Sequence, residues 1–136
     1  MEKDLESYFK HDRFAQYVGI ELSDISEGRA RARMKVQEHH MNAINIVHGA
    51  AIFVLADLVF AMASNSHRTV AMAINVSISY LKAARTGTLF AEAEEVSRNP
   101  KLATYTVRVT DDDDELIAIF QGMVYRKKDP IPIDCD

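Results

Sequence analysis

The stretch from Asn42 to Asn65, which reads NAINIVHGAAIFVLADLVFAMASN, constrains the fold more than any other part of the chain. It predicts a helix that is almost wholly apolar from Ala50 to Ala63, with Asp57 as its one charge. A helix that is apolar on all sides must be covered on all sides, and one curled sheet covers about half of it. We therefore expect a second subunit to supply the remaining cover.

The segments around this helix predict strands, apart from the N-terminal residues 1–17, which predict one or two short helices. The predicted strands are residues 20–26, 29–37, 72–80, 88–97, 103–109 and 116–120. Residues 129–136 are expected to form a flexible tail. Strands and helices do not alternate along the chain. The sequence therefore favours an α+β fold in a single domain, 1–136, with a curled antiparallel sheet wrapped around one long central helix.

Two of these strands have strictly alternating side chains. In the strand after the helix, we expect the core face to carry Met72, Ile74, Val76, Ile78 and Tyr80. In the segment RARARM, one face carries Arg29, Arg31 and Arg33. These arginines form either a solvated strand face or a phosphate-binding stripe, and the alternation favours the solvated face.

Composition excludes several classes of protein. A hydrophobic content of 48% and a charged content of 26% are typical of a folded globular chain, and the net charge of −4 argues against a nucleic-acid binder. No apolar run reaches the roughly 18 residues that span a bilayer, and the charged N-terminus does not resemble a signal peptide. The single cysteine, Cys135, cannot form an intrachain disulfide, which favours the cytoplasm.

Metal and cofactor sites are not predicted. The pair His39-His40 lacks further ligands at zinc spacing, and the run from Asp111 to Asp114 lacks the glycine and spacing of a calcium loop. We expect this acidic run to be a solvated hairpin tip.

The residues that could carry chemistry lie in and just before the central helix. Asp57 is a general base, a nucleophile or a structural carboxylate. Gly49 is either an ordinary helix-start glycine or the donor of a main-chain N–H to a developing oxyanion, with the helix dipole behind it. Asn42 and His48 either position the site or shape the turn that precedes the helix.

His48 and Asp57 cannot meet within one chain. They are nine residues apart, which places them on opposite sides of a helix and about 13 Å apart along its axis. In a two-fold dimer with antiparallel helices, the start of one helix can meet the middle of the other. If both residues serve one site, each dimer holds two shared sites.

The segment NAINIVHGAAIFVLADLVFA resembles the hotdog-fold acyl-CoA thioesterases of the phenylacetate-degradation type, in which it typically reads N-x5-HGG-x4-LAD-x3-A. The later segments ISYLKAARTGTLFAEAEEVSRNPKLATYTVRV and IAIFQGMVYRKK also resemble this family, so the similarity extends over about residues 14–128. Two positions depart from the pattern. Ala50 replaces the second glycine, and Ala73 replaces a Ser or Thr that relatives often carry.

The resemblance implies a homodimer with sites at its interface, often as a dimer of dimers, and no cofactor beyond the coenzyme A of the substrate. It implies that Asp57 is the catalytic carboxylate, that Gly49 is the oxyanion donor, and that Asn42 and His48 position the reacting groups.

We therefore expect hydrolysis of an acyl-CoA or aryl-acyl-CoA thioester. Ala50 and Val54 share the helix face of Asp57 and are candidates for the acyl pocket. The candidate cations for the phosphates of coenzyme A are Lys82, Arg85, Arg98 and Lys101. The alternatives are a non-enzymatic acyl-CoA-binding or sensing module and a hydratase. A binder has no need for a buried carboxylate, and the paired acid and histidine of a hydratase are not evident on the helix.

Overall fold

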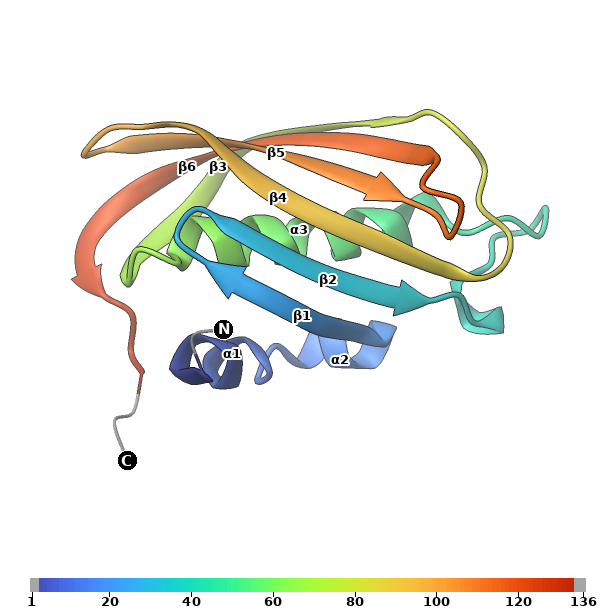
Figure 1. The fold of residues 1–136 in the computed structure, drawn as a ribbon, viewed down its shortest axis with the longest axis horizontal. Helices are drawn as coiled ribbons and strands as arrows, with labels where there is room; N and C mark the ends of the chain where they lie inside the picture. Colours follow the sequence, from blue (N-terminus) through green and yellow to red (C-terminus); the bar gives the residue numbers. More distant parts are fainter. Residues whose placement is uncertain (1–2, 134–136) are drawn as a thin grey trace.

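The computed structural model describes residues 3–133 and confirms the predicted architecture, an antiparallel sheet curled around one long helix (Figure 1). The strands follow the order β1-β2-β4-β5-β6-β3 across the sheet. In chain order the elements are α1 (Lys3–Phe9), α2 (Arg13–Val18), β1 (Ile20–Ser26), β2 (Arg29–Lys35), η1 (Glu38–His40, a 3-10 turn), α3 (Gly49–Asn65), β3 (Thr69–Tyr80), β4 (Thr88–Arg98), β5 (Leu102–Thr110) and β6 (Leu116–Pro130).

Helix α3 begins one residue before the predicted start and ends two residues after the predicted end. It packs against the strands of the sheet and against α2, and Leu55, Ala56 and Val59 are fully buried among them. One stripe of the helix stays partly open in the single chain, and its members follow helical spacing: Ala50, Val54, Asp57 and Ala61. The sheet thus covers most of the helix but leaves uncovered the side that carries its charge.

The alternation predicted for β3 is wrong at its beginning. Side chains opposite each other in an antiparallel pair lie on the same face of a sheet. Ile78 lies opposite the buried Phe120, as predicted, but it is Ala73 that lies opposite the buried Val124. The register shifts between positions 73 and 75, so one extra residue in β3 reverses the alternation. Met72 consequently lies on the outer face.

Strand β3 forms an open edge of the sheet. Its large apolar side chains are exposed in the single chain, although the sequence predicts a core face for them: Met72, Ile74, Val76 and Tyr80. Within residues 3–133, only β6 pairs with β3, so the other edge of this strand presents unpaired backbone groups. Val76 and Tyr80 on the inner face, and Met72 on the outer face, therefore all lack cover in the single chain.

Helices α1 and α2 pack against β1 of the sheet. Leu5 and Phe9 of α1 are buried, whereas Phe14 and Tyr17 of α2 are exposed. The predicted tail, 129–136, is wrong at its start, because β6 continues to Pro130 and the Ile131 side chain is buried. Residues 134–136, and with them Cys135, lie outside the described residues.

The contact between Phe60 of α3 and Gly122 of β6 sets how closely the helix approaches the sheet. A Cβ atom at position 122 would lie only 2.6 Å from the Phe60 ring. We expect Gly122→Ala to lower the free energy of unfolding by about 1–3 kcal/mol, because the ring has to move within a packed core. Urea unfolding measures this change, and Gln121→Ala, at the exposed neighbouring position, is the control. Equal stability of the two variants would contradict the close contact.

Candidate active site

The start of α3 leaves one main-chain donor free. His48 is the residue that caps the helix, and its Nδ1 accepts the N–H of Ala50 at 2.9 Å. The N–H of Ala51 donates to the main-chain oxygen of His48 at 3.0 Å. Within the described part of the chain, the N–H of Gly49 has no acceptor. It stands at the positive end of the helix dipole, where it can stabilise a developing negative charge on a substrate oxygen.

Tyr80 explains why position 49 is a glycine. A Cβ atom at Gly49 would lie 3.1 Å from Cζ of the Tyr80 ring, and the Tyr80 hydroxyl donates to the main-chain oxygen of Gly49 at 2.9 Å. Partial burial raises the pKa of Tyr80, which favours the protonated, donating form. The sequence analysis missed this residue as part of the site. The signal that could have found it is its place at the end of the inward row of β3.

Asn42 shapes the turn before the helix. Its side-chain Oδ1 accepts the N–H groups of Ile44 and Ile46, at 3.1 and 3.2 Å. This is the turn role that the sequence left open. Its Nδ2 has no acceptor among the residues that the structure describes, so the amide can still donate to a ligand.

Asp57 is a half-buried carboxylate in apolar surroundings. Burial raises the pKa of its carboxyl group, and the nearby carboxylate of Asp12 raises it further. Across residues 3–133 it has neither an ion-pair partner nor a hydrogen-bond partner. A carboxylate held this way is a stronger base than an exposed one, and its pKa lies closer to neutral pH.

The single chain does not bring these groups together. Because α3 is one continuous helix, Asp57 lies about 12 Å along the axis from Gly49. His48 and Gly49 thus form one half of the predicted constellation, with Asn42 in the preceding turn, and Asp57 forms the other. Ala50 and Val54 lie on the open stripe beside Asp57, as their spacing predicts.

The four candidate cations differ in their contacts. Lys82 forms ion pairs with Asp111 and Glu115, and Arg98 lies 3.9 Å from Glu95 and contacts His67. Within residues 3–133, the side chains of Arg85 and Lys101 have no ion-pair partner. Arg85 also lines a small cavity of about 200 Å³ beside the loop that follows β3.

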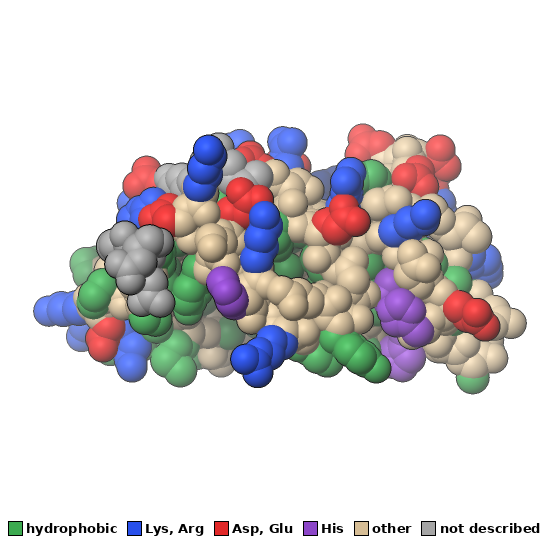
Figure 2. Space-filling model, turned by 90° about the horizontal axis from the view of Figure 1, so that it is seen from below, with side chains coloured by type: hydrophobic (Ala, Val, Ile, Leu, Met, Phe, Trp, Pro, Cys, Tyr) green, Lys and Arg blue, Asp and Glu red, His purple; other side chains and the backbone are tan. Residues whose placement is uncertain are grey.

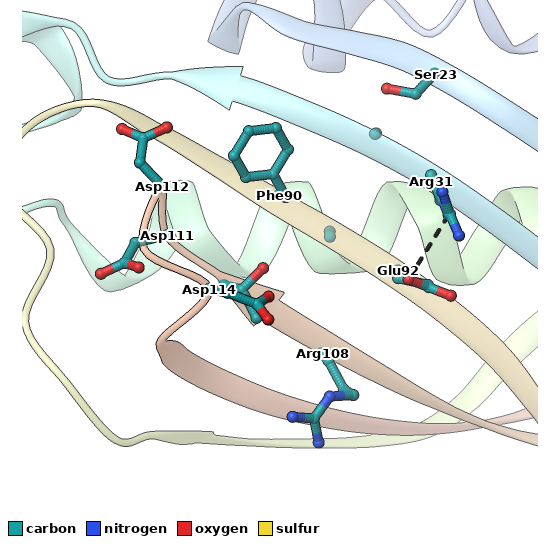
Figure 3. A pocket seen from close by; sticks show the side chains of 11 residues that line it. Ser23, Arg31, Phe90, Glu92, Arg108, Asp111, Asp112 and Asp114 are labelled. Carbon is teal, nitrogen blue, oxygen red and sulfur yellow. Dashed lines mark ion pairs between the residues drawn. The ribbon is translucent and has the colours of Figure 1, made fainter.

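A groove lies elsewhere, on the outer face of the sheet (Figure 3). It has a volume of about 580 Å³ and is lined by Arg31, Phe90, Arg108 and the acidic turn after β5, but by none of the predicted site residues. The arginines of RARARM pair with glutamates, Arg29 with Glu94 and Arg33 with Glu21 at 3.0 Å each, and Arg31 with Glu92 at 3.6 Å. These contacts favour the solvated strand face over a phosphate stripe.

The described residues were also compared with the requirements of a metal site and of a membrane-spanning helix. They hold no group of three or more His, Cys, Asp or Glu side chains placed to bind a metal ion. None of their helices is both long and apolar enough to cross a bilayer. On the face shown in Figure 2, acidic and basic side chains are interspersed, so this face has no continuous basic surface for nucleic acid.

The raised pKa of Asp57 predicts a pH-dependent stability. Folding favours its protonated form, so this contribution is complete below the unfolded pKa and is lost as the pH rises through the folded pKa. We expect Asp57→Asn to unfold at higher urea concentration than wild type at about pH 7, and at nearly the same concentration near pH 4. Asp113→Asn, at an exposed position, is the control. An advantage of Asp57→Asn that is equal at both pH values would contradict the assignment.

Comparison with known proteins places this geometry in a family. The family model of the thioesterase superfamily matches residues 44–118, more than half of the chain. The chain is 43% identical to a protein of Archaeoglobus fulgidus that carries the provisional name of esterase, over 97% of this chain and 86% of the relative.

Solved structures more than 25% identical in sequence share the fold, and two of them are described here. The PaaI protein from the phenylacetic acid degradation operon of Escherichia coli superposes with a TM-score of 0.90 at 28% identity, over 95% of this chain and 94% of that chain. The same protein is named acyl-coenzyme A thioesterase. A mutant of the phenylacetic acid degradation protein PaaI of Thermus thermophilus gives a TM-score of 0.82 at 31% identity, over 85% of this chain and 100% of that chain. The chain therefore belongs to the thioesterase superfamily and has the hotdog fold of its PaaI-type members.

Proposed function

We propose that this protein hydrolyses acyl-CoA thioesters at a site shared between two copies of the chain. The observation that carries the proposal is the free N–H of Gly49 at the capped start of α3. A carboxylate without a partner, Asp57, lies on the open stripe of the same helix. The name of the E. coli relative supports acyl-CoA as the substrate class.

The chemistry needs both groups in one place. The substrate carbonyl oxygen accepts the N–H of Gly49, which stabilises the charge that develops when the carbonyl carbon is attacked. In one route, Asp57 of the second copy removes a proton from the attacking water. In the other, its carboxylate attacks the carbon itself, and water then hydrolyses the acyl anhydride that forms. In both routes water is consumed, the carbon–sulfur bond breaks, and the thiolate of coenzyme A leaves and takes up a proton.

The second copy meets two needs of the single chain. Pairing at the free edge of β3 covers its exposed apolar side chains, and antiparallel packing of the two α3 stripes brings Gly49 of each copy to Asp57 of the other. A dimer of dimers is the further assembly that we propose, in the cytoplasm.

The substrate is assigned group by group. Ala50 and Val54, beside Asp57, line the acyl pocket, and the PaaI resemblance favours an aryl-acyl group from phenylacetate degradation. Arg85 and Lys101 are the better candidates for the phosphates of coenzyme A, because Lys82 and Arg98 already have carboxylate partners.

A non-enzymatic acyl-CoA-binding module is the second candidate function. It needs the same N–H donor at Gly49 and the same pocket. It gains nothing from a half-buried carboxylate without a partner, because partly dehydrating a carboxylate costs free energy. Asp57 therefore favours the enzyme.

Replacing Asp57 tests catalysis directly. With acyl-CoAs from acetyl to phenylacetyl and a free-thiol readout, we expect wild type to release coenzyme A. We expect Asp57→Asn to lower kcat at least about 100-fold, because the acid–base or nucleophilic group is lost. Asp24→Asn, at an exposed position of β1, is the matched control. Turnover of Asp57→Asn within a few-fold of wild type would remove Asp57 from the mechanism, whereas binding without turnover by wild type would favour the sensing module.

Mixing two variants that we expect to be inactive on their own tests the shared site. Asn42→Asp keeps the oxygen that holds the turn at Ile44 and Ile46 but loses the amide donor. In a heterodimer of one Asn42→Asp chain and one Asp57→Asn chain, one site carries both substitutions and the other site carries neither. We expect activity to return to about half that of a wild-type dimer. Subunit exchange is verified by native mass spectrometry, and complete exchange without recovery would contradict a site built from two chains.

A further inference from the structure

His40 is a buried histidine outside the residues that the proposed chemistry uses. It ends the 3-10 turn η1, between β2 and α3, and only 3% of its surface is exposed. Its neighbour His39 is exposed, and the two rings lie 4.2 Å apart between centroids. Two adjacent histidines of such different burial have different tasks, and the buried one is the one whose contacts need an explanation.

Both ring nitrogens of His40 bind main-chain groups. The N–H of Gln37 donates to Nδ1 at 2.9 Å, and Nε2 lies 2.5 Å from the main-chain oxygen of Val18, the last residue of α2. A carbonyl oxygen only accepts, so Nε2 must carry the proton and Nδ1 must be the acceptor. These two contacts fix one neutral tautomer of the ring.

The main chain of His40 continues this link into the candidate site. Its carbonyl oxygen accepts the N–H of His48 at 2.7 Å, and Nδ1 of His48 in turn caps the helix at Ala50. The next residue, Gly49, carries the free N–H. A chain of hydrogen bonds therefore runs from the end of α2 through the His40 ring and carbonyl to the residue beside the free donor.

We propose that His40 is a positioning residue for the turn at His48–Gly49. With its ring held between Val18 and Gln37, the carbonyl of His40 keeps one position, and the N–H of His48 is held there. Oxyanion stabilisation depends on where the donor points, so a small displacement of the turn lowers kcat without changing how the rest of the substrate binds.

The kinetic test compares the two histidines. We expect His40→Leu, which fills the space but makes neither ring contact, to lower kcat about tenfold with KM within about twofold of wild type. We expect His40→Gln, whose Nε2 can again donate to the oxygen of Val18, to recover most of this loss. His39→Leu is the control and should resemble wild type. A His40→Leu enzyme with the kcat of His39→Leu would overturn the proposal, and so would a loss that lies in KM alone.

This kinetic test rests on the proposed function, but a second measurement does not. The chain has five glycines, so protein labelled with ¹⁵N-glycine gives five amide signals, and Gly49→Ala identifies that of Gly49. We expect the signals of Gly19, next to Val18, and Gly49 to move in His40→Leu, and both to move by a smaller amount in His40→Gln, which keeps a donor to the oxygen of Val18. The signals of Gly28, Gly87 and Gly122 should stay. Movement of Gly19 alone would show that His40 only caps α2 and would overturn the proposal, whatever the substrate.

Discussion

The structure depends on keeping the apolar surface of α3 away from water. The sheet curls because it has to reach around a helix with almost no polar side, and its strands bury Leu55, Ala56 and Val59 completely. Gly122 lets the Phe60 ring come close enough for this packing. The one stripe that the sheet does not reach is the stripe that carries Asp57. Partial burial among apolar side chains raises the pKa of this carboxyl group. The part of the stripe that stays open is the reason why we propose a second copy.

Much of the fold could be predicted from the sequence, because the apolar helix and the alternating strands have clear local patterns. The length and apolarity of α3 and the alternation of Arg29, Arg31 and Arg33 in β2 follow local rules, and the structure shows them. The alternation in β3 failed because a bulge depends on the pairing with β6, which no local pattern reports. The prediction of a tail from residue 129 was wrong at its start, because Asp129 and Pro130 continue β6 although these residue types are typical of a loop.

The candidate site, like the fold, could be predicted only in part from the sequence. The motif placed Gly49 at the start of the helix and Asp57 in its middle, and helical geometry alone showed that they do not meet within one chain. It did not show that the Tyr80 ring lies against Gly49, nor that the turn needs the side chain of Asn42 as an acceptor. Both contacts join residues across a turn or between α3 and β3, so they emerge only from the folded chain. The buried His40, adjacent to an exposed histidine of the same type, could not be distinguished from it by sequence.

The two edges of the sheet differ in a way that bears on how the protein avoids aggregation. The outer edge, β1, is irregular at Leu22–Asp24, carries charged side chains such as Glu21 and Asp24, and has α1 and α2 packed against it (Figure 1). The other edge, β3, is long and apolar. A sheet with one receptive edge can be extended by a single neighbour, and that neighbour presents its own protected edge at the far side. In the dimer that we propose, growth by strand pairing therefore ends at two chains, and the hydrophobic strand is kept without the risk of an open-ended fibre.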